Sequence, residues 1–310
     1  MSLPPVVVAV PTEEIRDRLG ALPGAEVVVW DVGDAPLGRH IDLLLARYFL
    51  PAEALAALAG LPVSAVQSQS LGYDNVAAHL PPGITFCNAV GVHEASTAEL
   101  ALALTLASRR GFDEFRDAQV RRAWEHTRQP GLQGSNVVLV GVGGVGAATA
   151  RRLAPFEVSL TLVARTARES DLGHVHGMDE LPAILPTADV LILAVPLTAD
   201  TTGLVSTAML SHLQPGAVVV NVSRGAVIDT DALVEAVRTR GIRAAIDVTD
   251  PEPLPADHPL WSLPGVIITP HVGGDTGAMD RHVDRLLRDQ VARLVAGEPL
   301  EHVVIAGGAG

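Results

Sequence analysis

Short runs of β-branched and other apolar residues alternate with segments of helical periodicity along almost the whole chain. This alternation is typical of α/β proteins, in which each strand of a parallel sheet is followed by a helix. In the first third we predict strands at 6–10, 26–30, 41–46, 63–68 and 84–88, with helices after Thr12 and at 52–58. A long helix is then predicted from about Ser96 to about Arg122, where apolar residues recur at helical spacing.

A second α/β unit follows this long helix. Its predicted strands are 135–141, 158–164, 189–195, 217–222, 243–247 and 265–269, and its helices are 145–154, 206–212 and 230–240. A final amphipathic helix is predicted at about 276–296. Two α/β units joined by a long helix predict two domains with a cleft between them.

Composition excludes several classes of function. The chain of 310 residues has 22 basic residues, and reading the sequence shows that all are arginine. Without lysine there is no Schiff-base chemistry, no P-loop and no Tyr–Lys proton relay. The net charge of -13 argues against a nucleic-acid partner, because no basic patch is available to contact phosphates.

The single cysteine and the apolar pattern indicate where the protein works. Cys87 cannot form an internal disulfide, which fits a reducing compartment, and we expect it to be a buried strand residue. No apolar stretch approaches the roughly 18 residues of a membrane helix, so we expect a cytoplasmic protein without a membrane partner. We expect no metal site, because His174 and His176 form an HxH pair in a predicted loop without further ligands.

A glycine motif connects the predicted strand 135–141 to a predicted helix. It reads Gly141-Val142-Gly143-Gly144-Val145-Gly146. In this strand–turn–helix context, GxGxxG indicates a dinucleotide site, with the pyrophosphate at the helix N-terminus. Gly141 would allow the tight turn, Gly143 the approach of the backbone to the pyrophosphate, and Gly146 close packing of helix and sheet.

The end of the next strand distinguishes the two nicotinamide cofactors. An NAD site has an acidic residue there for the ribose 2′-hydroxyl. This chain instead has Arg165 and Arg168, which could hold a 2′-phosphate, with Thr166 donating a hydrogen bond. We therefore predict a preference for NADP(H), with NAD(H) as the alternative.

Three further segments follow predicted parallel strands, where open α/β sheets place their ligands. They are Asn221-Val222-Ser223-Arg224-Gly225, the run from Ala245 to Pro253, and Thr269-Pro270-His271-Val272-Gly273-Gly274. Together with 69–76, 88–92, 195–206 and 213–233, they resemble the D-isomer-specific 2-hydroxyacid dehydrogenases over nearly the whole chain. The resemblance implies two Rossmann-like domains: a flavodoxin-like substrate domain (1–93 plus 277–310) and a doubly wound dinucleotide-binding domain (94–276).

The resemblance also assigns roles. Arg224 would bind the carboxylate and carbonyl oxygen of a 2-keto acid, His271 would be the general acid or base, and Glu252 would hydrogen-bond the other ring nitrogen of His271. Backbone N–H groups around Ser70, Leu71 and Gly72 would bind the substrate carboxylate. The remaining cofactor contacts would be Gly144, Val145, Ala164, Val195, Pro196, Thr202, Val222, Ser223, His271, Gly273 and Gly274, with Asp247 near the nicotinamide.

The implied activity is hydride transfer between NAD(P)H and a 2-keto acid, giving a D-2-hydroxy acid, and the implied assembly is a homodimer packed partly through the 96–122 helix. One alternative is a dinucleotide-sensing binding protein, such as a co-repressor, on the same fold. The chain also departs from the family pattern at Glu157, where glycine is usual.

Overall fold

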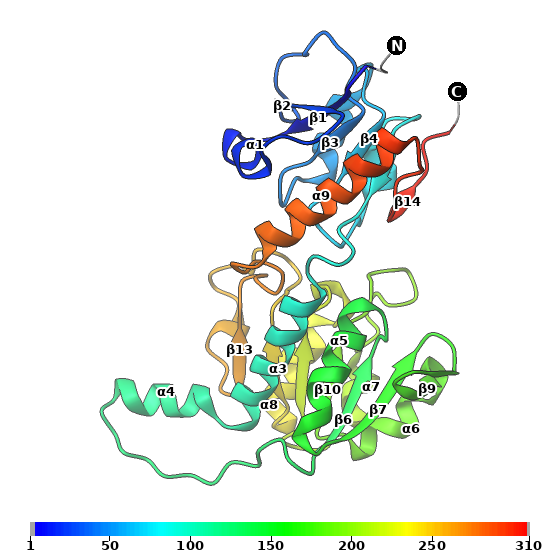
Figure 1. Ribbon diagram of the computed structural model, residues 1–310. Helices are drawn as coiled ribbons and strands as arrows, with labels where there is room; N and C mark the ends of the chain where they lie inside the picture. Colours follow the sequence, from blue (N-terminus) through cyan, green and yellow to red (C-terminus); the bar gives the residue numbers. More distant parts are fainter. Residues whose placement is uncertain (1–3, 309–310) are drawn as a thin grey trace. The chain divides into compact units, whose positions relative to one another are not determined.

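Two separate sheets organise the chain, and each belongs to its own unit (Figure 1). The computed structural model describes residues 4–308. Unit 1 contains the chain up to His93 and again from Gly277, and unit 2 runs from Glu94 to Thr276. Unit 2 is thus inserted between two parts of unit 1. The predicted α/β class with two domains is confirmed.

Unit 1 has a six-stranded sheet in the order β14-β5-β4-β3-β1-β2. All pairs are parallel except β14 with β5. The strands are β1 (Val6–Val10), β2 (Ala25–Val29), β3 (Leu43–Leu45), β4 (Ala65–Gln67), β5 (Thr85–Cys87) and β14 (Val303–Ile305). The helices are α1 (Glu13–Leu19), α2 (Val76–His79), α9 (Met279–Ala296) and the 3-10 helix η1 (Ala52–Leu58). Cys87 is a buried strand residue, as predicted.

Alternate strand residues of unit 1 face two separate apolar layers, because side chains along a strand alternate between its faces. One layer contains Val8, Val10 and Leu43 and packs against α1 and α9. The other contains Ala9 and Leu44 and packs against η1 and α2. Helix α9 contributes Val283, Leu286, Leu287 and Val291 to the first layer. Full burial of one such side chain stabilises a fold by about 1.5–3 kcal/mol.

Unit 2 has an eight-stranded sheet in the order β13-β12-β11-β10-β6-β7-β9-β8. Only β8 with β9 is antiparallel. The strands are β6 (Asn136–Val140), β7 (Ser159–Ala164), β8 (Arg168–Ser170), β9 (Gly173–Gly177), β10 (Val190–Leu193), β11 (Val218–Asn221), β12 (Arg243–Ile246) and β13 (Val266–Ile268). The helices are α3 (Glu94–Arg109), α4 (Phe112–Val120), α5 (Gly144–Leu153), α6 (Leu181–Ile184), α7 (Thr207–His212) and α8 (Thr230–Arg240).

Helices cover both faces of the central strands of unit 2. Strands β10 and β11 are buried along their whole length, which explains their continuous apolar sequences. On one face they pack against α3 and α5, through residues such as Leu104 and Leu153. On the other face they pack against α7 and α8, through Leu210 and Leu233. This is the doubly wound arrangement expected from the sequence.

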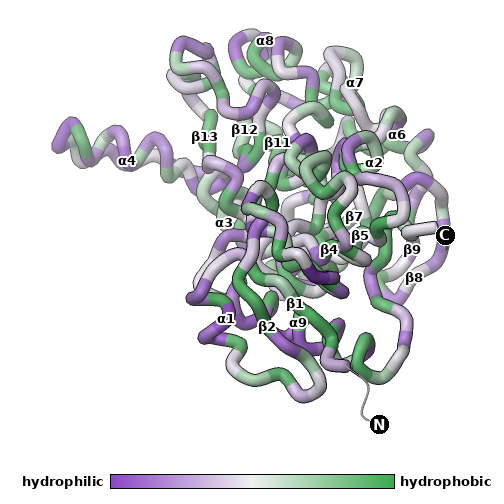
Figure 2. The backbone as a smooth tube through the Cα atoms, turned by 90° about the horizontal axis from the view of Figure 1, so that it is seen from above, coloured by the Kyte–Doolittle hydropathy of each residue, from purple (hydrophilic) through white to green (hydrophobic). Residues whose placement is uncertain are grey.

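The prediction of one helix over 96–122 is wrong. Helix α3 ends at Arg109, and α4 begins at Phe112. Between them Gly111 adopts a left-handed conformation with φ 66°, which ends a helix and suits glycine. Helix α4 then extends away from the rest of unit 2 (Figures 1 and 2).

The sequence analysis missed several short elements, among them α2, α6, β8, β9 and β14. His174 and His176 were placed in a loop but lie on β9. Their rings are 4.7 Å apart between centroids, and each ring bonds a carboxylate, Glu169 or Glu180. Strands β8 and β9 were missed because their residues are mostly polar or glycine and carry no apolar pattern.

The departure at Glu157 has a structural explanation. Glu157 adopts φ 57°, the left-handed region in which glycine is favoured. Its backbone carbonyl accepts the N–H of Gly134 at 3.0 Å, and its carboxylate accepts a hydrogen bond from Gln133. These two bonds hold the Glu157 backbone in the left-handed conformation, which costs a residue other than glycine about 1–2 kcal/mol.

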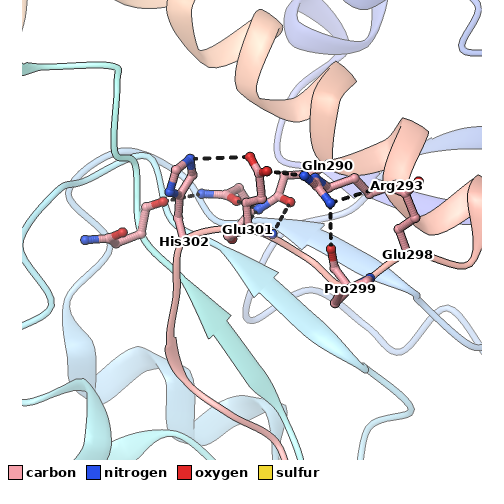
Figure 3. Close-up of polar contacts among 8 residues, drawn as sticks. Gln290, Arg293, Glu298, Pro299, Glu301 and His302 are labelled. Atoms are coloured by element: carbon pink, nitrogen blue, oxygen red, sulfur yellow. Dashed lines mark hydrogen bonds and ion pairs between the residues drawn. The ribbon is translucent and has the colours of Figure 1, made fainter.

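Polar side chains of α9 bond to the core of unit 1 and to the segment 298–301, which precedes β14 (Figure 3). Gln290 of α9 is 1% exposed, and its amide donates to Gln67 Oε1 and to the carbonyl of Glu301, both at 2.8 Å. The N–H of Glu301 returns a bond to Gln290 Oε1 at 2.9 Å. Arg293, one turn further, pairs with Glu298 and Glu301. This network positions β14 beside β5.

Within residues 4–308, no helix has the length and apolar character that crossing a membrane requires.

Candidate active site

Most predicted site residues of unit 2 lie in loops that follow parallel strands at one edge of its sheet. The glycine motif follows β6, Arg165 follows β7, Val195 follows β10, Arg224 follows β11, Asp247 follows β12 and His271 follows β13. The strand order reverses between β6 and β10, and open α/β sheets bind ligands at such a switch point. The fold therefore brings together segments that are far apart in the sequence.

The glycine turn leaves one end of α5 open to a ligand. Gly141 has φ 100°, and a Cβ on it would overlap the carbonyl oxygen of Ala194. A Cβ on Gly146 would overlap the carbonyl oxygen of Gly141, so the turn and the helix are in close contact. Gly143, by contrast, has no atom within 4 Å of its Cβ position, and as the N-cap of α5 it makes no side-chain cap bond. The N–H groups of this first turn therefore suit a phosphate group.

Basic and hydroxyl side chains follow β7. Ala164 ends the strand, and Arg165, Thr166 and Arg168 after it are exposed. Arg168 donates to the carbonyl of Thr166 at 3.3 Å, which keeps this short turn together. Residues 164–168 contain no acidic side chain that could accept from a ribose hydroxyl.

The loops after β10 and β11 carry the other predicted cofactor contacts. Val195 and Pro196 follow β10 directly, while the hydroxyl of Thr202 donates to the carbonyl of Thr198 at 2.8 Å. Val222 and Ser223 follow β11 and are 8% and 7% exposed. The Ser223 hydroxyl donates to Asn221 Oδ1 at 2.6 Å. The Thr202 and Ser223 hydroxyls are therefore used within the protein.

His271 and Glu252 form a close pair. The distance between His271 Nδ1 and Glu252 Oε1 is 2.6 Å. This hydrogen bond, opposed by burial, holds the pKa of Glu252 below its ordinary value, and the positive charge of Arg224 acts in the same direction. An ionised Glu252 favours a proton on Nδ1 and stabilises a positive charge on the ring.

The backbone at His271 is strained and held by Asp247. His271 has φ 54°, and its N–H donates to the carbonyl of Asp247 at 2.8 Å. The Asp247 carboxylate is 3% exposed and accepts from the N–H groups of Val272 and Gly273 at 2.9 and 2.8 Å. It also accepts from the hydroxyl of Thr269 at 2.6 Å. A strained residue persists where its surroundings determine its conformation, as these bonds do here.

Arg224 is held by residues of its own loop. The amide of Asn221 donates to the Arg224 carbonyl at 2.9 Å, and the guanidinium donates to the carbonyl of Ser223 at 2.8 Å. A Cβ on Gly225 would overlap the backbone of Thr249, only three residues before Glu252. The absence of a side chain at Gly225 therefore allows the loops of Arg224 and Glu252 to pack directly against each other.

The loop 68–72 of unit 1 has an ordered backbone. The N–H of Ser70 donates to the Ser68 hydroxyl at 2.9 Å, and the carbonyl of Leu71 accepts from the Asn88 amide at 2.9 Å. Among residues 4–308, the N–H groups of Leu71 and Gly72 have no hydrogen-bond acceptor. These two groups, rather than that of Ser70, are available to bind an anion.

Comparison with known proteins places this arrangement in a family. The family model described as "D-isomer specific 2-hydroxyacid dehydrogenase, NAD binding domain" matches residues 102–273. This range covers more than half of the chain and contains the glycine motif, Arg224, Glu252 and His271. The chain belongs to the D-isomer-specific 2-hydroxyacid dehydrogenases.

Curated relatives of this dehydrogenase include named dehydrogenases and reductases. The human glyoxylate reductase/hydroxypyruvate reductase is 31% identical over 307 residues, which is 93% of each chain. The D-3-phosphoglycerate dehydrogenase of Methanocaldococcus jannaschii is 32% identical over 243 residues, 76% of this chain. The match covers only 46% of that relative. The chain is accordingly an NAD(P)-dependent 2-hydroxyacid dehydrogenase.

Solved structures of the same family resemble the dehydrogenase over its whole length. A D-isomer-specific 2-hydroxyacid dehydrogenase from Xanthobacter autotrophicus, in complex with NADPH and MES, has a TM-score of 0.82 at 27% identity and covers 98% of both chains. An NADPH-dependent glyoxylate/hydroxypyruvate reductase from Sinorhizobium meliloti, in complex with NADP and sulfate, has a TM-score of 0.80 at 25% identity and covers 97% of this chain and 98% of that chain.

Sequence reasoning missed how the dehydrogenase fixes its histidine loop. The place of Asp247 near the nicotinamide stays a prediction, and both of its carboxylate oxygens also accept bonds from the loop 269–273. Thr269 was not singled out, although its hydroxyl completes this set. The position of Asp247 after a buried strand is the signal that could have suggested an anchor for a neighbouring loop.

Proposed function

We propose that the protein reduces the carbonyl of small 2-keto acids to D-2-hydroxy acids, with His271 as the proton donor. The observation that carries this proposal is the 2.6 Å pair of His271 and Glu252 at the ligand-binding edge of the unit 2 sheet. An imidazole that is oriented by a carboxylate can give a proton to a developing alkoxide. In the oxidative direction the same imidazole takes the proton back.

Glu252 determines which ring nitrogen of His271 exchanges a proton with the substrate. Because Nδ1 faces Glu252, the proton reaches the substrate oxygen from Nε2. The bonds from Asp247 to the loop 269–273 keep the ring in position between turnovers. Glu252 and Asp247 therefore act on His271 and not on the substrate.

Arg224 binds the substrate. Its planar guanidinium can donate two parallel hydrogen bonds to the carboxylate and carbonyl oxygens of a 2-keto acid. Its positive charge also stabilises the negative charge that develops on the carbonyl oxygen. In unit 1, we propose the N–H groups of Leu71 and Gly72 as anion-binding groups, because they have no acceptor among residues 4–308.

The residues at the glycine turn fit a dinucleotide. Gly143 leaves open space beside the first turn of α5, and the N–H groups of that turn match the charge of a pyrophosphate. The other residues assigned to the cofactor are Ala164, Val195, Pro196, Thr202, Val222, Ser223, Gly273 and Gly274. When bound, NAD(P)H supplies the hydride that reduces the carbonyl carbon.

A substrate panel tests the proposed function. Absorbance at 340 nm is followed with NADPH or NADH and glyoxylate, hydroxypyruvate or a bulkier 2-keto acid. Consumption of the reduced cofactor, with formation of the D-isomer of the product, supports the proposal. Cofactor binding without turnover over the whole panel would instead support a dinucleotide sensor.

We further propose that NADP(H) is preferred over NAD(H). Arg165 and Arg168 place two positive charges and Thr166 a hydroxyl after β7, where a 2′-phosphate would lie, and no carboxylate is present there. The double variant R165A/R168A should lower kcat/KM for NADPH about 30-fold or more, because two charge-assisted hydrogen bonds are lost. The value for NADH should change about twofold at most.

R151A is the matched control for this prediction. Arg151 is also on unit 2 and is 61% exposed, but its partner is Asp171. This variant should keep the wild-type preference. A wild-type enzyme with higher kcat/KM for NADH than for NADPH would overturn the proposal.

The third proposal concerns assembly: the protein forms a homodimer that involves α4. Phe112, Val120 and Trp124, on this helix and just after it, are 59%, 65% and 100% exposed. Trp124 also lines a hollow of about 570 Å³, together with residues such as Phe115 and Ala118 of α4. A helix that carries large apolar side chains away from its own unit suits burial against a second copy.

The variant F112E/W124E should convert a dimer into a monomer, because two acidic side chains in an apolar interface are strongly destabilising. Size-exclusion chromatography with light scattering measures the mass in solution. W261E is the control, since Trp261 is also exposed, at 52%, but lies in the 3-10 helix Pro259–Trp261. A monomeric wild-type protein would contradict the proposal.

A further inference from the structure

Glu94 lies against the glycine turn. It is the first residue of α3, and Gly144 is the first residue of α5. A Cβ built on Gly144 would be 2.7 Å from Glu94 Cγ and 3.1 Å from Glu94 Oε1. Both residues belong to unit 2. The Glu94 carboxylate is therefore close to the helix end to which we assign the pyrophosphate.

The Glu94 carboxylate and a bound pyrophosphate would compete for the same positive end of the α5 dipole. A carboxylate at a helix N-terminus is stabilised by the helix dipole, and α5 begins with glycines that provide no capping side chain. Glu94 supplies this negative charge from a neighbouring helix. A pyrophosphate that binds the same helix end carries further negative charge, and like charges a few ångströms apart repel each other in a partly buried site.

We propose that Glu94 acts as a resident anion at the N-terminus of α5 and weakens dinucleotide binding, so that it sets cofactor affinity and speeds cofactor release. The inference rests on the proposed dinucleotide site at the glycine turn. It assigns to Glu94 an effect on the phosphate part of the cofactor alone. A purely structural Glu94, an acidic residue in the first turn of α3, would stabilise the fold without changing cofactor affinity.

The variant E94Q, made in the full chain, separates these roles. Titration of protein with NADPH, followed by NADPH fluorescence, should give a Kd about five- to tenfold lower than that of the wild type at low salt. The difference should shrink as ionic strength rises, because salt screens the repulsion. The protein without cofactor should melt at a lower temperature than the wild type, since α5 loses its anion, while the upward shift on adding NADPH should be larger.

Two controls complete the design. E99Q removes the same charge from an exposed position on the same helix and should leave the Kd unchanged. Adenosine 2′-phosphate lacks the pyrophosphate, so it should not respond to the charge of Glu94. Its own Kd, calculated from competition with NADPH and the NADPH Kd of each protein, should be the same for the wild type and E94Q.

The outcomes distinguish the two proposals. If the wild type binds neither NADPH nor NADH, the proposed dinucleotide site is wrong. If the wild type binds NADPH and E94Q has the same Kd, or a higher one, the role of Glu94 is wrong and the proposed function is unaffected. An equal gain in affinity for E99Q would also overturn the inference, because the effect would then come from net charge.

Discussion

Replacing His271 with alanine should lower kcat for 2-keto acid reduction by about two or more orders of magnitude, because the alkoxide loses its proton donor. The Kd for NADPH should change little, since the side chain acts on the substrate oxygen. Stopped-flow or steady-state measurement of NADPH oxidation gives kcat, and fluorescence titration gives the Kd. The pair of measurements separates a lost chemical step from a lost cofactor site.

H258A is the control for this experiment. His258 is a second histidine of unit 2, and its ring accepts the N–H of Leu260 at the start of a 3-10 helix. Its loss should reduce stability slightly without a comparable effect on kcat. If H271A retained near-normal activity, His271 would have no part in the mechanism.

Replacing Arg224 with glutamine should lower kcat/KM for the 2-keto acid about 100-fold or more. The substrate loses a positive charge and two hydrogen bonds, and each charge-assisted bond contributes about 1.5–3 kcal/mol. R224K should give an intermediate value, because lysine keeps the charge but cannot donate two parallel bonds in one plane. The order wild type, R224K, R224Q therefore tests geometry and charge separately.

A change in folding would confuse this series, so the melting temperature of each variant is measured as well. R238K is the matched control, because Arg238 is an exposed residue of α8 on the same unit. It should keep full activity. An R224Q enzyme with unchanged kcat/KM would show that another group binds the substrate.

The strands and long helices of the fold were predictable because their apolar patterns extend over several residues. Strands β10 and β11 are continuous apolar runs, and α9 repeats apolar residues at helical spacing. The break at Gly111 was missed because the apolar spacing of α3 was extended across it. Strand β14 depends on a pairing partner distant in the sequence, β5, which a local pattern does not contain, and β8 has only three residues.

The candidate site was predictable where residue type implies chemistry, as for His271, Glu252 and Arg224. The supporting contacts were not, because they depend on which loops lie next to each other in space. Asp247 holds the loop of His271, and Gly225 lets two loops touch through their backbones. The sequence does not show which segments these residues contact, since the partners of each contact lie more than twenty residues apart.

The insertion of unit 2 into unit 1 has a consequence for synthesis on the ribosome. Unit 2 is complete once residue 276 has emerged, but the apolar layer around Val8 and Leu43 still lacks α9 at that time. Synthesis adds about 5–20 residues per second, so α9 is made roughly ten seconds or longer after β5. During this time the apolar layer of the unit 1 sheet lacks this covering helix. A nascent chain with this exposed apolar face is the form in which we expect the protein to be most dependent on chaperones and most sensitive to premature termination.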